Sequence, residues 1–377
     1  MNISKKALAL HKKLGGKIAV VGKMTVKNRA DLSLVYTPGV ADVALYLSKN
    51  PKETRNYTAK KNLVAIVSDG SAVLGLGNIG PEGAIPVMEG KALLFKQFAD
   101  VDAFPIVLAT QDVDEIVETV KRIAPMFGGV NMEDISAPRC FEIEERLKRE
   151  LSIPVMHDDQ HGTAIVVLAG LLNACKVVGK DLKKMKVVIS GAGAAGVAVA
   201  KLLKLSGVSQ IIMLDRNGII YAERGELPGY KRDLAKWTNP KRVTGGFREA
   251  LTGADVLIGV SGPNTVSVDD IKAMAKKAIV FSLANPTPEI MPEEAKRGGA
   301  AVIATGRSDY PNQVNNSLVF PGIFRGALDH QVPSITDEMK LRAAKNLAGL
   351  IKKPTADCII PDMFDKRAVK AVASAVT

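Results

Sequence analysis

The sequence predicts an α/β protein, with an N-terminal α/β domain followed by a doubly wound domain on a parallel sheet. Short apolar runs alternate with amphipathic segments along most of the 377 residues, which is the pattern of strand–helix–strand units. The length corresponds to two or three domains. A very regular alternation begins at Lys186 and is preceded by a helical segment at 163–178, so we expect domains at residues 1–160 and 161–377.

The N-terminal part is expected to begin with a basic helical segment and a loop around Tyr36. Its apolar runs predict strands at 62–67, 104–109 and 153–156, and its periodicity predicts helices at 86–98, 113–123 and 141–151. A glycine-rich segment, residues 69–78, separates the first strand from the first of these helices. Strands that alternate with helices favour a mostly parallel sheet.

The C-terminal part has the more regular pattern. Its short apolar runs predict strands at 186–190, 210–214, 256–260, 278–283 and 301–303, with helical segments between them. Such a series is typical of a doubly wound fold, in which helices cover both faces of the sheet. Ligands of these folds bind at the carboxyl ends of the strands, so candidate functional residues are sought there.

Composition and charge exclude several classes of protein. Apolar residues make up 47% and charged residues 24% of the chain, which excludes disorder and fibrous folds. The net charge of +12 could favour binding of nucleic acid, anionic lipid or a small anionic substrate. Nucleic acid is disfavoured as a partner, because no run of five basic residues occurs and aromatic residues are only 5%. Three cysteines without a close pair indicate neither a zinc site nor disulfides.

The N-terminus and the apolar stretches predict a cytoplasmic protein that has no membrane partner. Residues 1–13 lack the apolar centre of a signal peptide. The uncharged stretch 187–200 has 14 residues, three of them glycine, and is therefore too short to span a membrane.

A glycine-rich turn follows the predicted strand 186–190 and opens a helix. It consists of Gly191, Ala192, Gly193, Ala194, Ala195 and Gly196. Glycines let a pyrophosphate approach the backbone and the helix N-terminus offers free N–H groups, so we expect a Rossmann-type NAD(P) site. Asp215 lies 19 residues after Gly196, where a carboxylate can bind ribose hydroxyls. Arg216, Lys231 or Arg232 could instead pair with a 2′-phosphate, which leaves NAD and NADP open.

Two acidic pairs are candidates for one metal site. They are Glu133 with Asp134, and Asp158 with Asp159. Both pairs are expected at the ends of strands, and the glycines at 128 and 129 would let the backbone turn so that adjacent side chains meet one ion. Oxygen ligands suit Mg²⁺ or Mn²⁺, whereas zinc would recruit His157. A solvated loop or a helix cap is the alternative explanation of each pair.

Lys91 is a candidate general base. It lies in the middle of an apolar stripe at helical spacing, made by Val87, Met88, Leu94 and Phe95. Desolvation lowers the pKa of a lysine, so that it can accept a proton near neutral pH. Alternatively, its stem packs on the core while its ammonium group reaches water.

Four further polar residues are weaker candidates. Tyr36 precedes a Thr-Pro-Gly turn, where a tyrosine usually packs with its hydroxyl in water. Asn285, Asn315 and Asn316 follow predicted strands of the second domain. Their amides could bind a carboxylate or a nicotinamide, although turn chemistry explains asparagines at such positions equally well.

These residues together resemble the malic enzymes, in particular the short prokaryotic type. The matching motifs are Tyr36 to Val40, Ser68 to Gly70 with Leu74 to Asn78, Gly90 to Leu93, Glu133 with Asp134, His157 to Thr163, Gly191 to Gly196, and Asn285 to Thr287. They occur in order from about residue 20 to the C-terminus, so the resemblance covers nearly the whole chain.

The resemblance implies oxidation of (S)-malate by NAD(P) and decarboxylation to pyruvate and CO2, by a homodimer. It implies that Glu133, Asp134 and Asp159 hold Mg²⁺ or Mn²⁺, with support from Asp158. Lys91 would be the general base and Tyr36 the general acid. The substrate would be contacted by Asn285, Asn315 and Asn316, and Asn285 would also contact the nicotinamide. One position departs from larger relatives, which carry a substrate-clamping arginine where this chain has Ala72. The loop 70–78, through its N–H groups, Ser71 or Asn78, could replace that arginine.

Three alternative functions remain. A malolactic enzyme would use much the same residues but release lactate and retain its cofactor. A hydroxy-acid dehydrogenase without decarboxylation would need a His–Asp pair and no metal, and only His157 and His161 lie near the proposed site. A regulator that senses dinucleotides would have no turnover at all.

Overall fold

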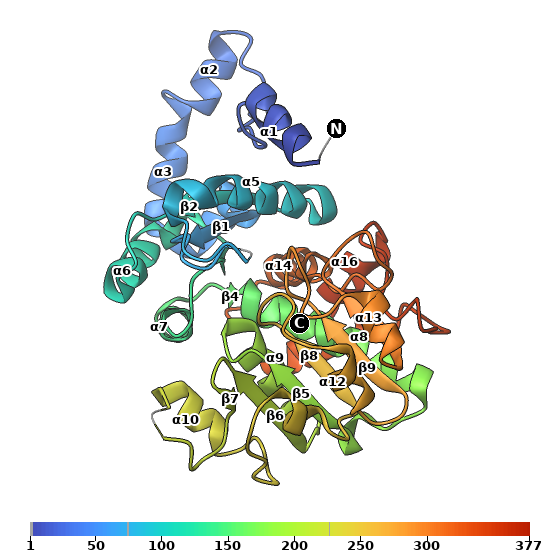
Figure 1. Cartoon of the computed structure of the whole chain (residues 1–377). Coiled ribbons are helices and arrows are strands. Elements are labelled where there is room, and N and C mark those ends of the chain that lie inside the picture. The colour runs from blue at the N-terminus through green and yellow to red at the C-terminus, as the bar shows by residue number, and fades with distance from the viewer. Residues whose placement is uncertain (1–2, 74, 226) are drawn as a thin grey trace.

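The computed structural model describes residues 3–73, 75–225 and 227–377, so Leu74 of the glycine-rich motif lies outside the described residues. It contains two sheets (Figure 1). The first has the order β2-β1-β3-β4 and is parallel throughout, with β1 Leu63–Ser68, β2 Asp102–Val107, β3 Gly129–Met132 and β4 Val155–His157. The second has the order β10-β9-β8-β5-β6-β7, with β5 Lys186–Ser190, β6 Gln210–Asp215, β7 Gly218–Ile219, β8 Val256–Gly259, β9 Ala278–Ser282 and β10 Ala300–Thr305. The predicted fold class is confirmed.

Helices cover both faces of the first sheet. On one face, α6 (Val113–Ile123) and α7 (Arg139–Glu150) pack on apolar strand residues such as Val67 and Met132. On the other, α5 (Gly80–Ala99) and α14 (Phe320–His330) pack on Val64 and Ile66. Alternate residues of β1 therefore point into two different cores, as they must in a parallel sheet that is buried on both faces.

The second sheet is sandwiched in the same way. Val187 and Ile189 of β5 face α9 (Ala194–Leu205) and α15 (Asp337–Ala348), and Val188 faces α11 (Phe247–Leu251), α12 (Val268–Lys272) and α13 (Pro292–Arg297). All strands of this sheet are parallel except β7, which pairs antiparallel with β6. Three further α-helices are α4 (Thr54–Tyr57), α10 (Gly229–Ala235) and α16 (Arg367–Ala373).

Helix α8 (Asp158–Val178) connects the two sheets and belongs to the core of both. Its apolar side chains join a single cluster with Val64 and Ile66 of the first sheet and with Val187 and Ile189 of the second. This helix has the length and hydropathy of a membrane span, but 72% of its most apolar window is buried inside the protein, as in a core helix. From Ala164 onward, α8 is therefore held by packing against both sheets.

Helices α1 (Ile3–Leu14), α2 (Arg29–Val35) and α3 (Gly39–Lys49) extend away from both sheets (Figure 1). We call residues 3–49 the N-terminal arm. None of the described residues before Val64 is buried. The arm exposes Leu8, Leu10, Leu14, Val20, Val21, Met24, Val26, Leu32, Leu34, Tyr36, Val40, Val43, Leu45 and Tyr46. Apolar surface of this extent marks an interaction site in a folded protein.

The predicted boundaries differ from the structure at two functional helices. Helix 113–123 and strand 186–190 have the predicted bounds. Helix α5 begins at Gly80 and not at Pro86, because Pro81 already supplies the fixed φ that suits a first turn. Helix α8 begins at Asp158 and not at 163, since acidic residues in the first turn interact favourably with the helix dipole. Strands β3 and β7 were not predicted, being only four and two residues long.

Candidate active site

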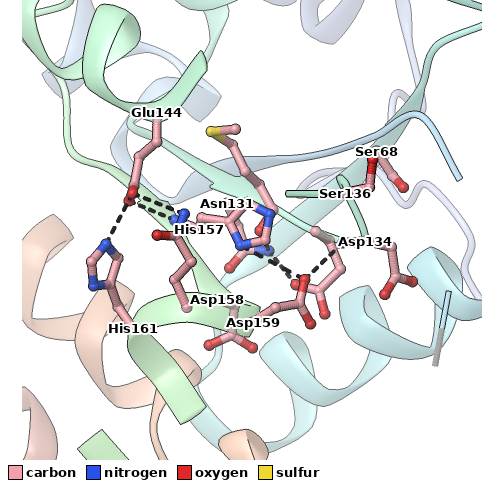
Figure 2. A network of polar contacts seen from close by, with 12 residues as sticks. Ser68, Asn131, Asp134, Ser136, Glu144, His157, Asp158, Asp159 and His161 are labelled. Carbon is pink, nitrogen blue, oxygen red and sulfur yellow. Dashed lines mark hydrogen bonds and ion pairs between the residues drawn. The ribbon is translucent and has the colours of Figure 1, made fainter. Parts of the chain in front are cut away.

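Three carboxylates converge where β3 and β4 end. Single oxygens of Glu133, Asp134 and Asp159 all lie within 4.8 Å of one another. The chain turns at Asp134, which has a φ of 54° and so lets its side chain join that of Glu133. The glycine at 129 begins β3 and does not make this turn, so that part of our explanation was wrong. The Asp134 N–H donates to Asp159 Oδ2 at 2.8 Å, which ties the two strand ends together (Figure 2).

The donor set of this cluster fits a hard divalent cation. Glu133 and Asp134 are buried, and all three residues of the cluster offer carboxylate oxygens, which Mg²⁺ and Mn²⁺ prefer as ligands. His157 is buried beside the cluster with its Nδ1 3.7 Å from Asp159 Oδ2, but it does not belong to the set of convergent ligands. The chemistry of the cluster therefore favours oxygen coordination over the zinc alternative.

Lys91 projects from α5 into the same cluster. Its Nζ donates to Glu133 Oε1 at 2.7 Å and to Asp158 Oδ2, and lies 4.0 Å from the centre of the Phe320 ring. Only 7% of the side chain is exposed, so the alternative in which the ammonium reaches water is wrong. Burial alone would lower the pKa of Lys91, but the Asp158 and Glu133 carboxylates outweigh it and raise that pKa. The predicted depressed pKa is therefore wrong.

Asp158 and Asp159 begin α8 but have different partners. The Asp158 side chain is fully buried and pairs with Lys91, while burial raises its own pKa. Asp159 belongs to the convergent carboxylates. Gly162 makes this arrangement possible, because a Cβ there would lie 1.8 Å from Asp158 Oδ1 and 3.2 Å from the Asn316 Cβ. The same close packing brings Asn316 beside the cluster.

The segment that follows β1 borders the cluster at Ala72. The Ala72 N–H donates to the Asp134 carbonyl at 2.9 Å, so the position of the missing arginine borders the metal cluster. Ser71 Oγ accepts the Ser136 N–H, and Asn78 pairs with Gln111. Both side chains that could replace the arginine are thus already hydrogen-bonded within the protein.

The second sheet meets this loop at Asn285. Gly75 packs so closely there that a Cβ would lie 2.0 Å from the Asn285 carbonyl oxygen. Glu289 supports the loop that carries Asn285, because its buried carboxylate accepts the Ser261 and Ala284 N–H groups. Asn315 instead caps the short 3-10 helix Asn316–Leu318 by accepting the Ser317 N–H at 2.9 Å. Asn316 therefore lies beside the cluster and Asn285 against Gly75 of the loop, while Asn315 makes the turn hydrogen bond that was the alternative explanation.

The turn Gly191–Gly196 has the geometry of a dinucleotide site at the point where β5 has neighbours on both sides. Gly191 has a φ of +114° and a Cβ there would lie 2.6 Å from the Val260 carbonyl. A Cβ at Gly196 would lie 1.8 Å from the Gly191 carbonyl, so this glycine lets α9 pack against the turn. Gly193, which begins α9, faces open space. That space leaves room for a pyrophosphate at the helix N-terminus.

Asp215 ends β6, but its carboxylate already has two cationic partners. Arg224 Nη2 and Lys231 Nζ each lie 2.6 Å from Asp215 Oδ2. Burial opposes ionisation, but these hydrogen bonds lower the pKa of Asp215 to about 2. The sequence had suggested Lys231 as a partner of a 2′-phosphate, and neither its pairing with Asp215 nor that of Arg224 was predicted, since nothing in a loop sequence shows which basic residue folds back on the strand end.

Tyr36 does not join the cluster within one chain. It is the C-cap residue of α2, and Figure 1 shows α2 away from β4 and the start of α8. Its side chain is 67% exposed. Of the predicted site residues, the structure thus brings together Lys91, the four carboxylates and Asn316, places Asn285 against Gly75, and leaves Tyr36 outside.

Two family descriptions match the chain. Residues 15–148 match "Malic enzyme, N-terminal domain", and residues 160–377 match "Malic enzyme, NAD binding domain". The chain is 55% identical to a bifunctional malic/malolactic enzyme of Bacillus subtilis, covering 100% of this chain and 92% of the relative. It is 54% identical to an NAD-dependent malic enzyme of Geobacillus stearothermophilus, with 100% and 78% covered. The crystal structure of an NAD-dependent malic enzyme from Thermotoga maritima superposes with a TM-score of 0.95 at 50% identity, covering 98% of each chain.

Proposed function

The chain belongs to the malic enzyme family of NAD(P)-dependent oxidoreductases, and from this premise we propose that it converts (S)-malate to pyruvate and CO2 at the cluster around Lys91. One observation carries the proposal. A buried lysine meets a convergent carboxylate triad, and the glycine-rich loop beside the triad packs on Asn285 of the nucleotide-binding sheet. Substrate, metal and nicotinamide could therefore contact each other there.

Glu133, Asp134 and Asp159 would hold Mg²⁺ or Mn²⁺. Such a cation, when bound, supplies positive charge that polarises the malate hydroxyl and stabilises charge that develops on its oxygen. Asp158 stays outside this ligand set and serves Lys91. At the position of the missing arginine, Ala72 has no side chain that could pair with a substrate carboxylate, and its N–H group already donates to the Asp134 carbonyl.

Lys91 and Asp158 would work as a pair that holds one proton. Lys91 is charged in its ion pairs, so it must release a proton before it can accept another. Asp158 is the acceptor for that proton, because burial favours its neutral form. The neutral Lys91 amine would then take the proton of the malate C2 hydroxyl, while the C2 hydrogen would pass as hydride to the nicotinamide of NAD(P). After loss of CO2, a proton from Tyr36 at C3 completes pyruvate.

A second copy of the chain would bring Tyr36 to this site. Tyr36 is 67% exposed on an arm with no buried residue, and Leu34 beside it is 72% exposed. We infer a homodimer in which the N-terminal arm packs on the partner subunit and delivers the general acid there. Burial of the arm's apolar side chains would drive the association. Sedimentation equilibrium should find a dimer.

The cofactor would be NAD, with NADP accepted. Because Arg224 and Lys231 neutralise Asp215, this carboxylate does not repel a 2′-phosphate as a free carboxylate would. Arg216, next to Asp215, could pair with that phosphate. We place the enzyme in the cytoplasm, with malate and pyruvate as its small-molecule partners.

A single assay tests the reaction. The protein is mixed with (S)-malate, Mn²⁺ and NAD or NADP, and reduced cofactor and pyruvate should appear in equal amounts. Lactate formed without reduced cofactor would identify a malolactic enzyme. The similarity to the bifunctional malic/malolactic enzyme of Bacillus subtilis favours this alternative. Absence of any turnover with either metal and either cofactor would contradict the proposed function and favour a regulator.

A further inference from the structure

Glu144 lies on α7, outside the carboxylate triad, and only 6% of its side chain is exposed. Figure 2 shows its carboxylate pointing at the junction between β4 and α8. That junction carries Asp158 and Asp159, the first two residues of the helix. Glu144 therefore contacts this junction on the side opposite the carboxylate triad.

Every acceptor site of the Glu144 carboxylate is used. Oε1 accepts the His157 backbone N–H at 2.9 Å and pairs with Lys148 at 2.7 Å. Oε2 accepts from Gln160 at 3.2 Å and from His161 Nε2 at 2.9 Å. Three of the four partners belong to residues 157–161, and they bracket Asp158 and Asp159 in the sequence.

The charge of Glu144 suits this position. Burial opposes ionisation, but His161 and Lys148 hold the pKa of Glu144 well below its usual range. An anion at a helix N-terminus interacts favourably with the helix dipole. His157, the residue that precedes α8, provides no capping hydrogen bond from its own side chain. Glu144 thus caps α8 from a neighbouring helix.

Packing alone does not fix the outer side of the junction. A cavity of about 290 Å³ opens there between α7, α8, α9 and α15, and Glu144, Gln160 and His161 line it. The hydrogen bonds to Glu144 therefore hold this side of the helix start. On the inner side, Asp158 contacts Lys91 and Asp159 accepts the Asp134 N–H.

We propose that Glu144 is a positioning residue of the reaction, which fixes the start of α8 and thereby aims Asp158 at Lys91 and Asp159 at the metal. This proposal rests on the metal site proposed above. Successive residues of a helix differ by about 100° around its axis, so a small rotation of the first turn moves both carboxylates. Working sites tolerate displacements of only about 0.5 Å.

The test is Glu144→Gln, which keeps the size of the side chain but removes its charge. The dissociation constant of Mn²⁺ is measured without malate or cofactor, from the paramagnetic resonance of free Mn²⁺. We expect a rise of about 10- to 100-fold, as for other groups that orient metal ligands. Hydrogen exchange of the His157 amide should accelerate, while the dissociation constant of NAD stays within about twofold. Glu145→Gln is the matched control, since Glu145 is exposed on the same helix.

The outcomes separate this proposal from the one on which it rests. If the wild type binds no Mn²⁺, the proposed metal site is wrong, and the exchange of the His157 amide still tests the role of Glu144. Equal Mn²⁺ affinity of the folded variant and the wild type overturns the proposal, as does unchanged exchange at His157. If Glu144→Gln does not fold, His161→Leu removes one donor and leaves the carboxylate. This second variant should weaken Mn²⁺ binding several-fold, and unchanged affinity would overturn the proposal equally.

Discussion

Replacing Lys91 separates its chemical role from its electrostatic one. Lys91→Met removes the cation that pairs with Glu133 and Asp158, both of which are buried. Lys91→Arg keeps a cation at the same place but holds its proton firmly, because the pKa of a guanidinium lies above about 12. Both variants should lose turnover, and only the methionine variant should lose much stability.

The magnitudes follow from the burial of the cluster. A positioned general base contributes about 10²–10⁴-fold to rate, so turnover should fall by that factor in both variants. Removing one partner of a buried ion pair costs about 3–5 kcal/mol, because the remaining carboxylates are left unpaired. Added Mn²⁺ should restore part of that loss in Lys91→Met, since it offers another positive charge to the same carboxylates.

Two measurements check this prediction: the initial rate of cofactor reduction at saturating malate, and the free energy of unfolding in urea with and without Mn²⁺. Lys96→Met is the control, because Lys96 is 54% exposed on the same helix and pairs with Asp100 and Asp102. It should retain turnover and lose less than about 1 kcal/mol. Wild-type turnover in Lys91→Arg would refute the proton transfer, and wild-type stability in Lys91→Met would refute the role of the buried pair.

Four further predictions follow. Chelation by EDTA should abolish turnover and added Mn²⁺ should restore it, and full activity after chelation would contradict the metal role. The variant Asp159→Ala should lose turnover but still bind NAD, as measured by calorimetry. Arg216→Ala should raise the KM for NADP more than the KM for NAD, and equal effects would show that Arg216 does not contact the 2′-phosphate. Leu34→Glu should shift the sedimentation equilibrium to monomer and lower turnover, whereas an unchanged dimer would exclude the N-terminal arm as the interface. Arg224→Ala should lower the free energy of unfolding above pH 3.8, the ordinary pKa of Asp215, and this difference should shrink as the pH falls towards 2 and the carboxyl is protonated. The part that remains comes from the hydrogen bonds of Arg224 to the Gly218 and Ile219 carbonyls. A difference that does not change with pH would show that the pair with Asp215 is not its source.

The sequence predicted those parts of the fold that repeat a pattern. Strands such as 186–190 were found because several apolar residues follow one another, and helix 113–123 because its apolar residues recur on one face. Strand β3 was missed because it has only four residues, one of them the buried polar Asn131. Pattern is a property of many residues together, so it is weakest where an element is short.

The candidate site depended on different information. The carboxylate cluster was suggested by strand-end positions and by the family resemblance, and the structure brings its oxygens together. The ionisation of Lys91 could not be predicted, because apolar neighbours on its own helix say nothing of Asp158 and Glu133 on other elements. The roles of Glu144 and Arg224 could not be predicted from neighbouring residues either, since each contacts a residue on another element of the fold.

The continuity of α8 limits how this protein can be divided. The triad draws Glu133 and Asp134 from the first sheet, but Asp159 from a helix that runs on beneath the second. A recombinant fragment that ends at residue 160 would keep all three ligands and lose nearly the whole helix that holds one of them. Swapping nucleotide-binding modules between relatives at that position would therefore cut through the helix that carries Asp159. A protein engineer who wishes to exchange cofactor specificity would do better to join the pieces after Val178, where the helix ends at Gly179.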